Sequence, residues 1–415
     1  MTHPAESANP IEYSRLQQFS QQTSFYCTLA FAFFIPISPA LMNLFLFFTL
    51  IFVLLSGNLK EHWHTAWSNP VARGGILLFL LFMAGTTWSI VDYSEALKGL
   101  KKYNELWYIA LLLPLFNTEK RKELGINTFL ASMTFILVIV YSIYFGLMDQ
   151  MQVPISEGHT TIISVDGGFR THIITNILMS FAVFIFAQRA LLKKGVVRGG
   201  YIVLFVASFY YTLFISTGTT GQILVIGLIA LLFIQHWRWK SAAIIPLFIG
   251  AIFSYGQYNT HTSINHAINK MIGGVEHDGG SASQRREFVT NSLYLIQENL
   301  WLGSGTGSVS QRYSEIPRDR IRTNITTNPH NEYAATALQL GLIGIIGLLL
   351  LFSTQYRQSR LINSLEHRYI AQGLITFIIV ASFGNSMLMD AGEGHFWIFF
   401  VALLFASNKL SPTQT

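Results

Sequence analysis

Apolar runs close to the length of a membrane-spanning helix recur along the whole chain, and they restrict its fold more than any other feature. The chain is 51% hydrophobic and only 12% charged over 415 residues, which is about half the charged fraction of a soluble protein. Backbone groups in lipid need hydrogen-bond partners within their own segment, so these runs are expected to be helices. The sequence therefore predicts an all-α polytopic membrane protein.

The apolar runs predict about twelve transmembrane helices within a single integral membrane domain that covers residues 1–415. Several runs are shorter than the roughly 20 residues that cross the hydrocarbon core, so flanking Tyr, Trp, Gly and Ser must extend them. The first run is expected to be a membrane anchor rather than a cleaved signal peptide. The expected spans are Phe25–Ala40, Leu41–Gly57, Ile76–Ile90, Leu106–Phe116, Phe129–Leu147, Ile173–Phe186, Tyr201–Ile215, Ile223–Ile234, Ala242–Ser254, Ala334–Phe352, Tyr369–Phe383 and Phe396–Ala406.

Lys and Arg in the short loops indicate the orientation of these spans. With both termini in the cytoplasm, most of the basic residues fall in short cytoplasmic loops, as the positive-inside rule requires. The exported side then holds a modest loop, Met148–Arg170, and a long loop over residues 255–333 that exceeds a mere connection. Within the long loop, SASQRREFVTNSLYLIQENLWLGSGTGS predicts an amphipathic helix that ends at glycines.

A histidine lies between a proline and an asparagine in TTNPHNEYAATALQLGLIG, just before a long apolar helix. Asn328 is expected to cap this helix and Pro329 to take its first position, which places His330 in the first turn. A helix N-terminus disfavours the imidazolium, so His330 should stay neutral and able to accept a proton. These residues alone leave a purely structural role and a chemical role equally open.

Basic residues on the exported side run against the topology rule and are candidates for binding an anion. Arg285 and Arg286 open the amphipathic helix, either as a face in contact with water or lipid headgroups, or as bidentate ligands of a pyrophosphate. Lys101, Lys102 and Arg170 lie at the exported ends of spans, where snorkelling anchors are the alternative to a functional role.

Two further exported segments carry polar groups whose roles the sequence leaves open. Gly303-Ser304-Gly305 suits either a phosphate-cradling loop or a helix stop. GNSMLMDAGEGHFW places Asn385, Asp390, Glu393 and His395 in a short exported loop, and their spacing matches no compact metal motif. A hydrogen-bonded turn or a partner for exported arginines is therefore preferred. The chain has no Walker loop, nucleotide fingerprint, nucleophile elbow or HExxH motif, so energy from ATP is not indicated.

The segment PHNEYAATALQLGLIG resembles the signature of the O-antigen ligase and polymerase superfamily, which has His-Asn, an apolar helix and then Gly-x-x-Gly. An arginine that opens a loop helix and a following Gly-x-Gly complete the pattern, and the KKY and NSMLMDAGEGH segments are similar to the ligase branch. The similarity runs over most of the chain from Leu97 onward. The residues that carry it are His330, Asn331, Gly341 and Gly344, with Arg285 eighteen residues before Gly303.

The resemblance implies a GT-C-type membrane glycosyltransferase that moves a polysaccharide from undecaprenyl pyrophosphate onto a sugar of lipid A–core. It places this ligase in the bacterial inner membrane with its active site on the periplasmic face, and it implies no metal, nucleotide or other cofactor. The implied partners are the lipid-linked donor, the lipid A–core acceptor and membrane lipids, with no nucleic acid.

The resemblance also implies roles for individual residues. His330 would be the general base on the acceptor hydroxyl, and Arg285 would stabilise the charge of the leaving pyrophosphate. Pyrophosphate binding would fall to Arg286, Arg170, Lys102 and Lys101, with Asn331, Asp390 and Glu393 in supporting positions. The chain departs from the family pattern in one place, because it has Thr219 and Thr220 where many relatives have an arginine.

Three other functions are alternatives to the ligase. An O-antigen polymerase uses the same donor with a second lipid-linked glycan as acceptor, and a protein O-oligosaccharyltransferase would have a longer C-terminal region. A polysaccharide transporter would show ionisable groups within its spans and internal symmetry. The chain shows neither feature, so the sequence favours the ligase, with the polymerase next.

Overall fold

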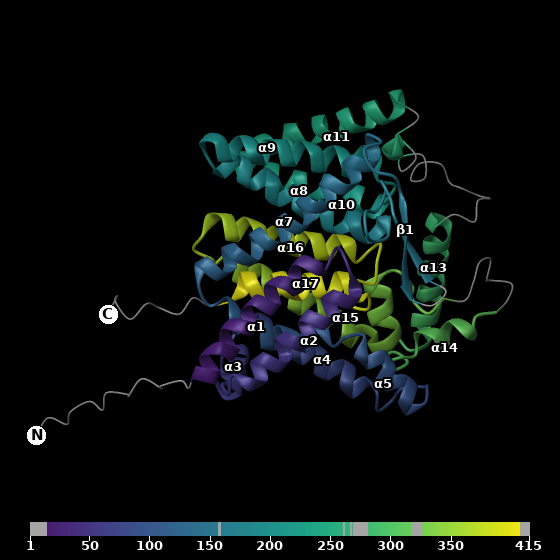
Figure 1. The fold of residues 1–415 in the computed structure, drawn as a ribbon. Coiled ribbons are helices and arrows are strands. Elements are labelled where there is room, and N and C mark those ends of the chain that lie inside the picture. The colour runs from purple at the N-terminus through teal and green to yellow at the C-terminus, as the bar shows by residue number, and fades with distance from the viewer. Residues whose placement is uncertain are drawn as a thin grey trace, which may run out of the picture.

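The computed structural model describes residues 15–156, 159–259, 262–265, 268, 281–317 and 326–406, which form a bundle of helices (Figure 1). In its first half lie α1 (Arg15–Phe34), α2 (Pro39–Leu55), α3 (Leu59–Ser68), α4 (Pro70–Gly85), α5 (Tyr93–Lys101), α6 (Glu105–Leu112), η1 (Leu113–Phe116), α7 (Glu119–Tyr144) and α8 (His172–Leu192). The second half contains α9 (Gly195–Tyr210), η2 (Tyr211–Ile215), α10 (Thr219–Trp237), η3 (Arg238–Lys240), α11 (Ser241–Tyr258), α13 (Ser281–Glu298), α14 (Val309–Ser314), α15 (Glu332–Ser359), α16 (Leu365–Ala381) and α17 (Ala391–Phe405).

The expected helical character of the apolar runs is confirmed, because each of them falls largely within a helix. Among the described residues, five helical segments are long and apolar enough to cross a membrane, or up to six if α2 and α3 form one span bent by 109°. Several other apolar helices, such as α17, are shorter. The chain is therefore a multi-pass membrane protein, and the figure of twelve crossings stays a prediction.

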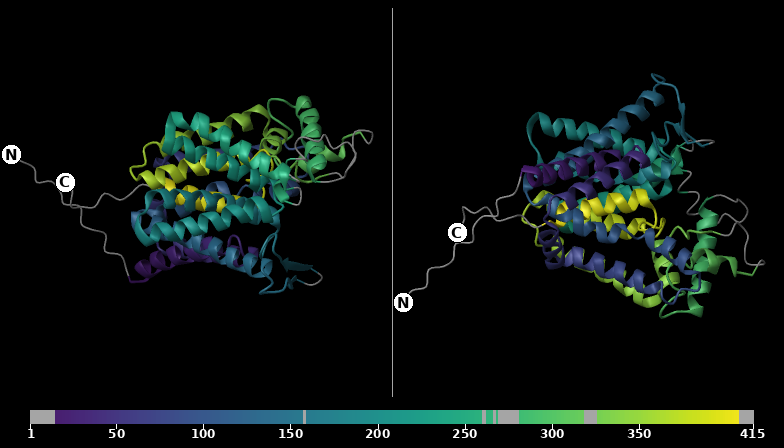
Figure 2. Two further views of the ribbon diagram at one scale, coloured as in Figure 1. Left: turned by 90° about the horizontal axis from the view of Figure 1, so that it is seen from above. Right: turned by 60° about the horizontal axis from the view of Figure 1, so that its bottom comes forward.

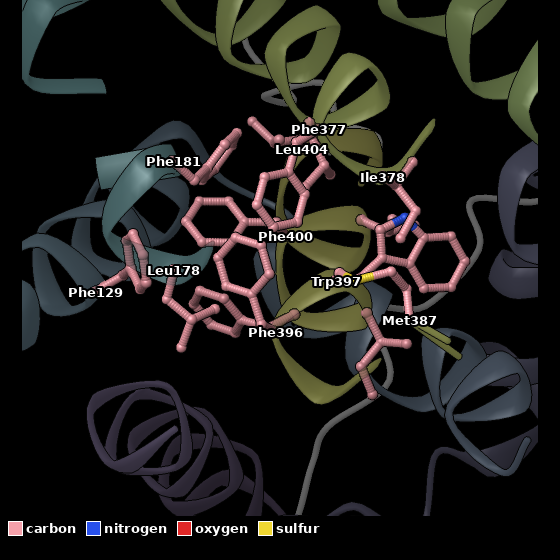
Figure 3. Close-up of a cluster of buried hydrophobic side chains, with 14 of the residues drawn as sticks. Phe129, Leu178, Phe181, Phe377, Ile378, Met387, Phe396, Trp397, Phe400 and Leu404 are labelled. Carbon is pink, nitrogen blue, oxygen red and sulfur yellow. The ribbon is translucent and has the colours of Figure 1, made fainter. Parts of the chain in front are cut away.

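Helix α17 forms the centre of the bundle. Every residue from Gly392 to Phe405 is buried, which is typical of a helix that is apolar on all sides and surrounded by others. Phe396 and Phe400 pack against Phe181 of α8 with ring centroids 5.4 and 5.0 Å apart, and Trp397 lies on the opposite side toward α16 (Figure 3). This aromatic core holds α17 in place, and with it the residues that precede its first turn.

The loops predicted to be exported lie together at one end of the bundle. In both views of Figure 2, α13 and α14 (green) lie at the same end as the strands β1 (Met151–Ser156) and β2 (His159–Ile163). The start of α7 lies at the other end, where Lys122 Nζ donates to the carbonyl of Ala406 at 2.8 Å. This arrangement matches the alternation predicted from the basic residues, while the orientation in the membrane stays a prediction.

At the end of the bundle opposite to α13, a buried arginine connects several helices through ion pairs. Arg189, in the last turn of α8, is 0% exposed and pairs with Glu123 and Glu366 at 2.8 Å each. Its guanidinium also donates to the hydroxyl of Tyr201 at 2.9 Å, and Lys193 pairs with Glu366 at 2.8 Å. The positive-inside rule treats Arg189 only as a cytoplasmic charge. In the structure its contacts join α7, α8, α9 and α16.

The segments predicted to be exported contain more regular structure than the sequence indicated. The loop before α8 forms an antiparallel hairpin of β1 and β2, in which Met151 pairs with Ile163. The amphipathic helix predicted in the long loop is confirmed as α13, and a short helix, α14, follows it. The predicted loop 255–333 also includes residues 260–261, 266–267, 269–280 and 318–325, which lie outside the described part of the chain.

Helix α15 is broken at Gly341, and a segment of the long loop repairs the break. Gly341 has φ 60° and ψ −152°, and two of the hydrogen bonds that would span it, from Leu342 to Leu338 and from Ile343 to Gln339, are replaced. The backbone of residues 300–305 provides the new partners. The four bonds run from Leu342 N to Leu300 O (2.9 Å), Ile343 N to Trp301 O (3.4 Å), Ser304 N to Leu338 O (2.8 Å) and Gly305 N to Gln339 O (2.9 Å).

These bonds decide between the two interpretations of Gly303-Ser304-Gly305. The amides of Ser304 and Gly305 donate to α15, and the amide of Gly303 donates to the carbonyl of Asn299 at 2.9 Å. The phosphate-cradling interpretation is therefore wrong, because all three amides are already bonded within the protein. The glycines end the chain reversal after α13 and allow its backbone to touch that of α15.

Substitution of Gly341 by Ala should destabilise the protein strongly. A Cβ at this position would lie 2.4 Å from the carbonyl carbon of Trp301, and the positive φ is itself strained for alanine by about 1–3 kcal/mol. We expect Gly341→Ala to lower the thermal unfolding midpoint of the detergent-purified protein by several degrees or to prevent folding. Gly227→Ala in α10 is the matched control, because nothing lies within 4 Å of its Cβ. Equal midpoints for the two variants would contradict the backbone-to-backbone contact.

Candidate functional site

The segment Thr326–Asn331 holds His330 just outside α15, not in its first turn. The helix begins at Glu332, and its N-cap is Asn331, whose side chain accepts a hydrogen bond from the amide of Ala334 at 2.9 Å. The expectation that Asn328 caps the helix and that Pro329 begins it is therefore wrong. Asn328 instead accepts a bond from the amide of His330 at 2.9 Å.

Asn331 takes the N-cap position because hydrogen bonds to the loop between α16 and α17 also fix it in place. Its amide N–H donates to Ser386 Oγ and its side-chain amide donates to the carbonyl of Phe383, both at 3.1 Å. The next amide, that of Glu332, donates to the carbonyl of Ser382 at 2.9 Å. The start of α15 is thus bonded to the loop between α16 and α17.

The backbone and ring of His330 are both constrained by their surroundings. His330 has φ 50°, a left-handed conformation that histidine and asparagine adopt more readily than most residues. Its ring is half-buried and lies against Phe288 of α13, with ring centroids 6.2 Å apart. The imidazole of His330 therefore contacts α13.

The imidazole of His330 is held in its neutral form. Burial lowers its pKa below the ordinary value of 6.5, and the positive charge of Arg285 lowers it further. The neutrality expected from the sequence is thus supported, but its cause is burial and a neighbouring cation rather than a place in the first helical turn. A neutral imidazole can accept a proton near pH 7.

Only one of the two adjacent arginines of α13 points into this site. Arg285 Nη1 donates to Thr220 Oγ1 at the start of α10, with a donor–acceptor distance of 3.1 Å. Burial lowers the pKa of Arg285, yet a guanidinium stays charged because its ordinary pKa lies far above neutral pH. Arg286 is exposed. Arg285 therefore brings a half-buried positive charge close to both His330 and Thr220.

Asp390, the N-cap of α17, links His330 to the lysines of the α5–α6 junction. The side-chain amide of Asn328 donates to Asp390 Oδ1 at 3.1 Å, so one asparagine contacts both the backbone of His330 and this carboxyl. Burial raises the pKa of Asp390, while the Asn328 hydrogen bond and the charge of Lys102 oppose that rise. Lys101 and Lys102 are both exposed at this position.

Arg170 lies on the same side of α17 and faces a second carboxyl. Its Nη1 donates to the carbonyl of Ile35 at 3.3 Å, and burial lowers its pKa while the charge of Glu393 opposes this shift. Glu393 is only 2% exposed and accepts a hydrogen bond from Asn385 Nδ2 at 3.4 Å. The suggestion that this segment partners an exported arginine agrees with this arrangement.

Two buried carboxyls near the site were missed by sequence reasoning, which gave neither of them a role. Glu332 is 0% exposed and accepts hydrogen bonds from the amide of Leu388 at 2.8 Å and from Thr336 Oγ1 at 3.2 Å. Glu105 is 4% exposed, with Oε1 3.3 Å from His395 Nδ1. The signal was present, because an acid stands directly before an apolar run in both cases.

The arrangement can therefore bind an anion and remove a proton at one place. The His330 imidazole, the half-buried guanidinium of Arg285 and basic residues of the segments predicted to be exported lie around the N-terminal ends of α15 and α17. Within the described residues, no group of three or more His, Cys, Asp and Glu is placed to hold a metal ion.

Comparison with known proteins identifies a family over the region that contains the site. Residues 202–349 match the model of a family described as O-Antigen ligase. The matched region includes Arg285, His330 and Asn331, and it also contains Gly341, where the loop segment bonds to α15. No curated protein matches the chain.

Removal of the Asn331 side chain should weaken the attachment of the site to the bundle. Asn331→Ala loses the cap, which contributes about 1 kcal/mol, and leaves the carbonyl of Phe383 without its donor. We expect a lower thermal unfolding midpoint for this variant. Asn331→Ser keeps a capping oxygen but not the amide donor, and its midpoint should fall between those of the wild type and Asn331→Ala. A midpoint for Asn331→Ala equal to that of the wild type would rule out the anchoring role.

Proposed function

We propose that this chain, whose residues 202–349 match the O-antigen ligase family model, is a ligase that transfers O-antigen polysaccharide from undecaprenyl pyrophosphate onto lipid A–core. The observation that carries this proposal is the position of His330 beside α13, where its half-buried ring lies against Phe288 and the half-buried guanidinium of Arg285 is close enough to lower its pKa. In this proposal the protein lies in the bacterial inner membrane, its termini are cytoplasmic and the site opens to the periplasm.

His330 is the general base of the proposed transfer. A hydroxyl of the acceptor sugar attacks the anomeric carbon of the donor glycan, and a new carbon–oxygen bond forms there. The bond from the anomeric carbon to the pyrophosphate oxygen breaks, and its electron pair leaves with the pyrophosphate. The imidazole of His330 takes the proton of the acceptor hydroxyl, a contribution of typically about 10²–10⁴-fold. The activated leaving group makes a further energy source unnecessary.

Arg285 stabilises the negative charge that develops on the leaving pyrophosphate. A guanidinium presents parallel donors that match phosphate oxygens, and a buried charge acts more strongly than an exposed one. Arg286 and Arg170 contribute positive charge at the same end of the bundle. Asn331, Asp390 and Glu393 support the site by fixing the start of α15, the His330 segment and Arg170.

The hydrogen bond between Arg285 and Thr220 lies at the position where this chain lacks the arginine of many relatives. Where many relatives carry an arginine, this chain has Thr219 and Thr220 at the start of α10. The guanidinium of Arg285 lies 3.1 Å from Thr220 Oγ1, so a cation supplied by α13 is present beside that position. This contact supports a single arginine serving a region that two would serve elsewhere.

Removal of the imidazole should abolish ligation and leave polymer synthesis intact. We expect His330→Ala and His330→Asn to lose attachment of glycan to lipid A–core by about 10²-fold or more, while polymer accumulates on the lipid carrier. Asparagine tolerates the positive φ of this position, so it removes the base without removing the backbone preference. The measurement is electrophoresis of lipopolysaccharide and of carrier-linked polymer from cells that carry each variant.

Other outcomes of that experiment would redirect the assignment. Smooth lipopolysaccharide in cells with His330→Asn would contradict the general-base role. Loss of the polymer itself, in cells without the gene for this chain, would identify a polymerase that uses the same donor.

The pH dependence of transfer should report the environment of His330. The base must be unprotonated, and its pKa is lowered, so the acid limb of kcat/KM should lie below pH 6.5. Arg285→Met removes a repelling charge, which raises the pKa of His330 and moves the acid limb of the residual activity to higher pH. Arg285→Lys keeps the charge and should leave the limb near its original place. An acid limb that does not respond to Arg285→Met would show that another group controls it.

A further inference from the structure

A cavity of about 420 Å³ lies beside the site, between α2, the α5–α6 junction and the start of α17. One wall is apolar and comes from Leu46, Phe47 and Leu50, which follow one face of α2. Phe47 is 57% exposed, so this edge helix presents an open apolar surface to its surroundings. Lys101 and Lys102 line the opposite rim, and both are exposed.

The cavity also has a buried polar lining. Glu105 and His395 both line it and are 4% and 6% exposed, with Oε1 and Nδ1 separated by 3.3 Å. The other carboxyl oxygen, Glu105 Oε2, is buried and has no hydrogen-bond partner among the described residues. A buried carboxyl oxygen without a partner is costly unless a ligand group bonds to it. A hydroxyl of a bound sugar would supply that bond.

The features of the cavity suit one kind of molecule. The apolar wall on α2 suits a lipid chain, and the two lysines suit a phosphate, which ammonium groups bind as point charges. The unpartnered carboxyl oxygen suits a hydroxyl donor. A glycolipid that carries phosphate has all three groups, whereas an ordinary fatty acid has neither the phosphate nor the hydroxyls. Both substrates of the proposed transfer meet this description, and because Arg285 is the proposed site of the donor pyrophosphate, the cavity is assigned to the acceptor.

The cavity and His330 are connected through Asp390 and Asn328. Met389 and Ala391 line the cavity, while Asp390 between them accepts a hydrogen bond from Asn328, which in turn accepts one from the amide of His330. Arg285 approaches the same histidine from α13 and bonds to α10. Two groups of cationic side chains are therefore connected to the segment that carries His330: Lys102 interacts with Asp390, and Arg285 interacts with the imidazole itself.

We propose that this cavity binds the phosphate-bearing headgroup of the acceptor glycolipid, while Arg285 receives the pyrophosphate of the donor. The inference rests on the proposed transfer, in which two lipid-linked substrates must approach one base, and it assigns a subsite to each. It separates Lys101 and Lys102 from the donor pyrophosphate, to which the sequence assigned them together with Arg285. Glu105 Oε2 accepts a hydroxyl of the acceptor headgroup.

Kinetics of the full chain with both substrates test this assignment. In detergent, with donor saturating, the double variant Lys101→Gln/Lys102→Gln should raise the KM for lipid A–core about tenfold. Its kcat and its KM for the undecaprenyl-pyrophosphate-linked donor should stay within about twofold of the wild type. Lys98→Gln is the matched control, because Lys98 lies on the same helix, is exposed and pairs with Glu95 away from the cavity. It should leave all three parameters unchanged.

Removal of phosphate from the acceptor provides the complementary change. Lipid A–core treated with a phosphatase should show the raised KM with the wild type, and no further increase with the double variant, because the lysines and the phosphate act on each other. Direct binding of intact lipid A–core, measured by equilibrium dialysis in detergent, should weaken in the same proportion. Unchanged thermal unfolding midpoints would establish that the variants are folded.

The results that would overturn the inference are distinct from those that would overturn the transfer. A raised KM for the donor would assign the lysines to the donor, and an unchanged KM for both substrates would remove the cavity from substrate binding. A wild-type protein that transfers no glycan would contradict the proposed function. In that case, direct binding still tests the cavity. If the double variant bound lipid A–core as tightly as the wild type, the cavity would be rejected as a glycolipid site as well.

Discussion

The repair of α15 at Gly341 is the interaction on which the rest of the site depends. A helix that breaks inside a membrane protein leaves amides and carbonyls that cannot bond to water, each at a cost of several kcal/mol. Here two amides and two carbonyls are satisfied by the backbone of residues 300–305. Because that segment directly follows α13, the same bonds fix the helix that carries Arg285 against the helix whose start carries His330.

The chemistry of His330 then follows from what surrounds it rather than from its place in a helix. Phe288 covers its ring and Arg285 repels its proton, and both come from α13. Asn328 fixes its backbone from one side, and through Asp390 the same asparagine is tied to α17. The protonation state and the direction of the imidazole are thus properties of three elements that are far apart in the sequence.

The sequence was sufficient for the features that lipid imposes and insufficient for those that distant contacts impose. Apolar runs identified the helices because a span in lipid leaves no alternative to a helix. The local capping rule chose Asn328 and failed, because Ser386 and Phe383 decide in favour of Asn331. Arg189 was counted as a loop charge because nothing local indicates its partner Glu366, which lies 177 residues away.

The broken helix also has a consequence for how the protein is made. Residues 300–305 precede α15 in the chain, so the ribosome releases them before the helix that needs them. If the long loop has already crossed the membrane by then, the first half of α15 meets its backbone partners as it enters. Insertion of α15 ahead of that loop would leave the break exposed to hydrocarbon, so the order of the chain itself protects the assembly of this helix.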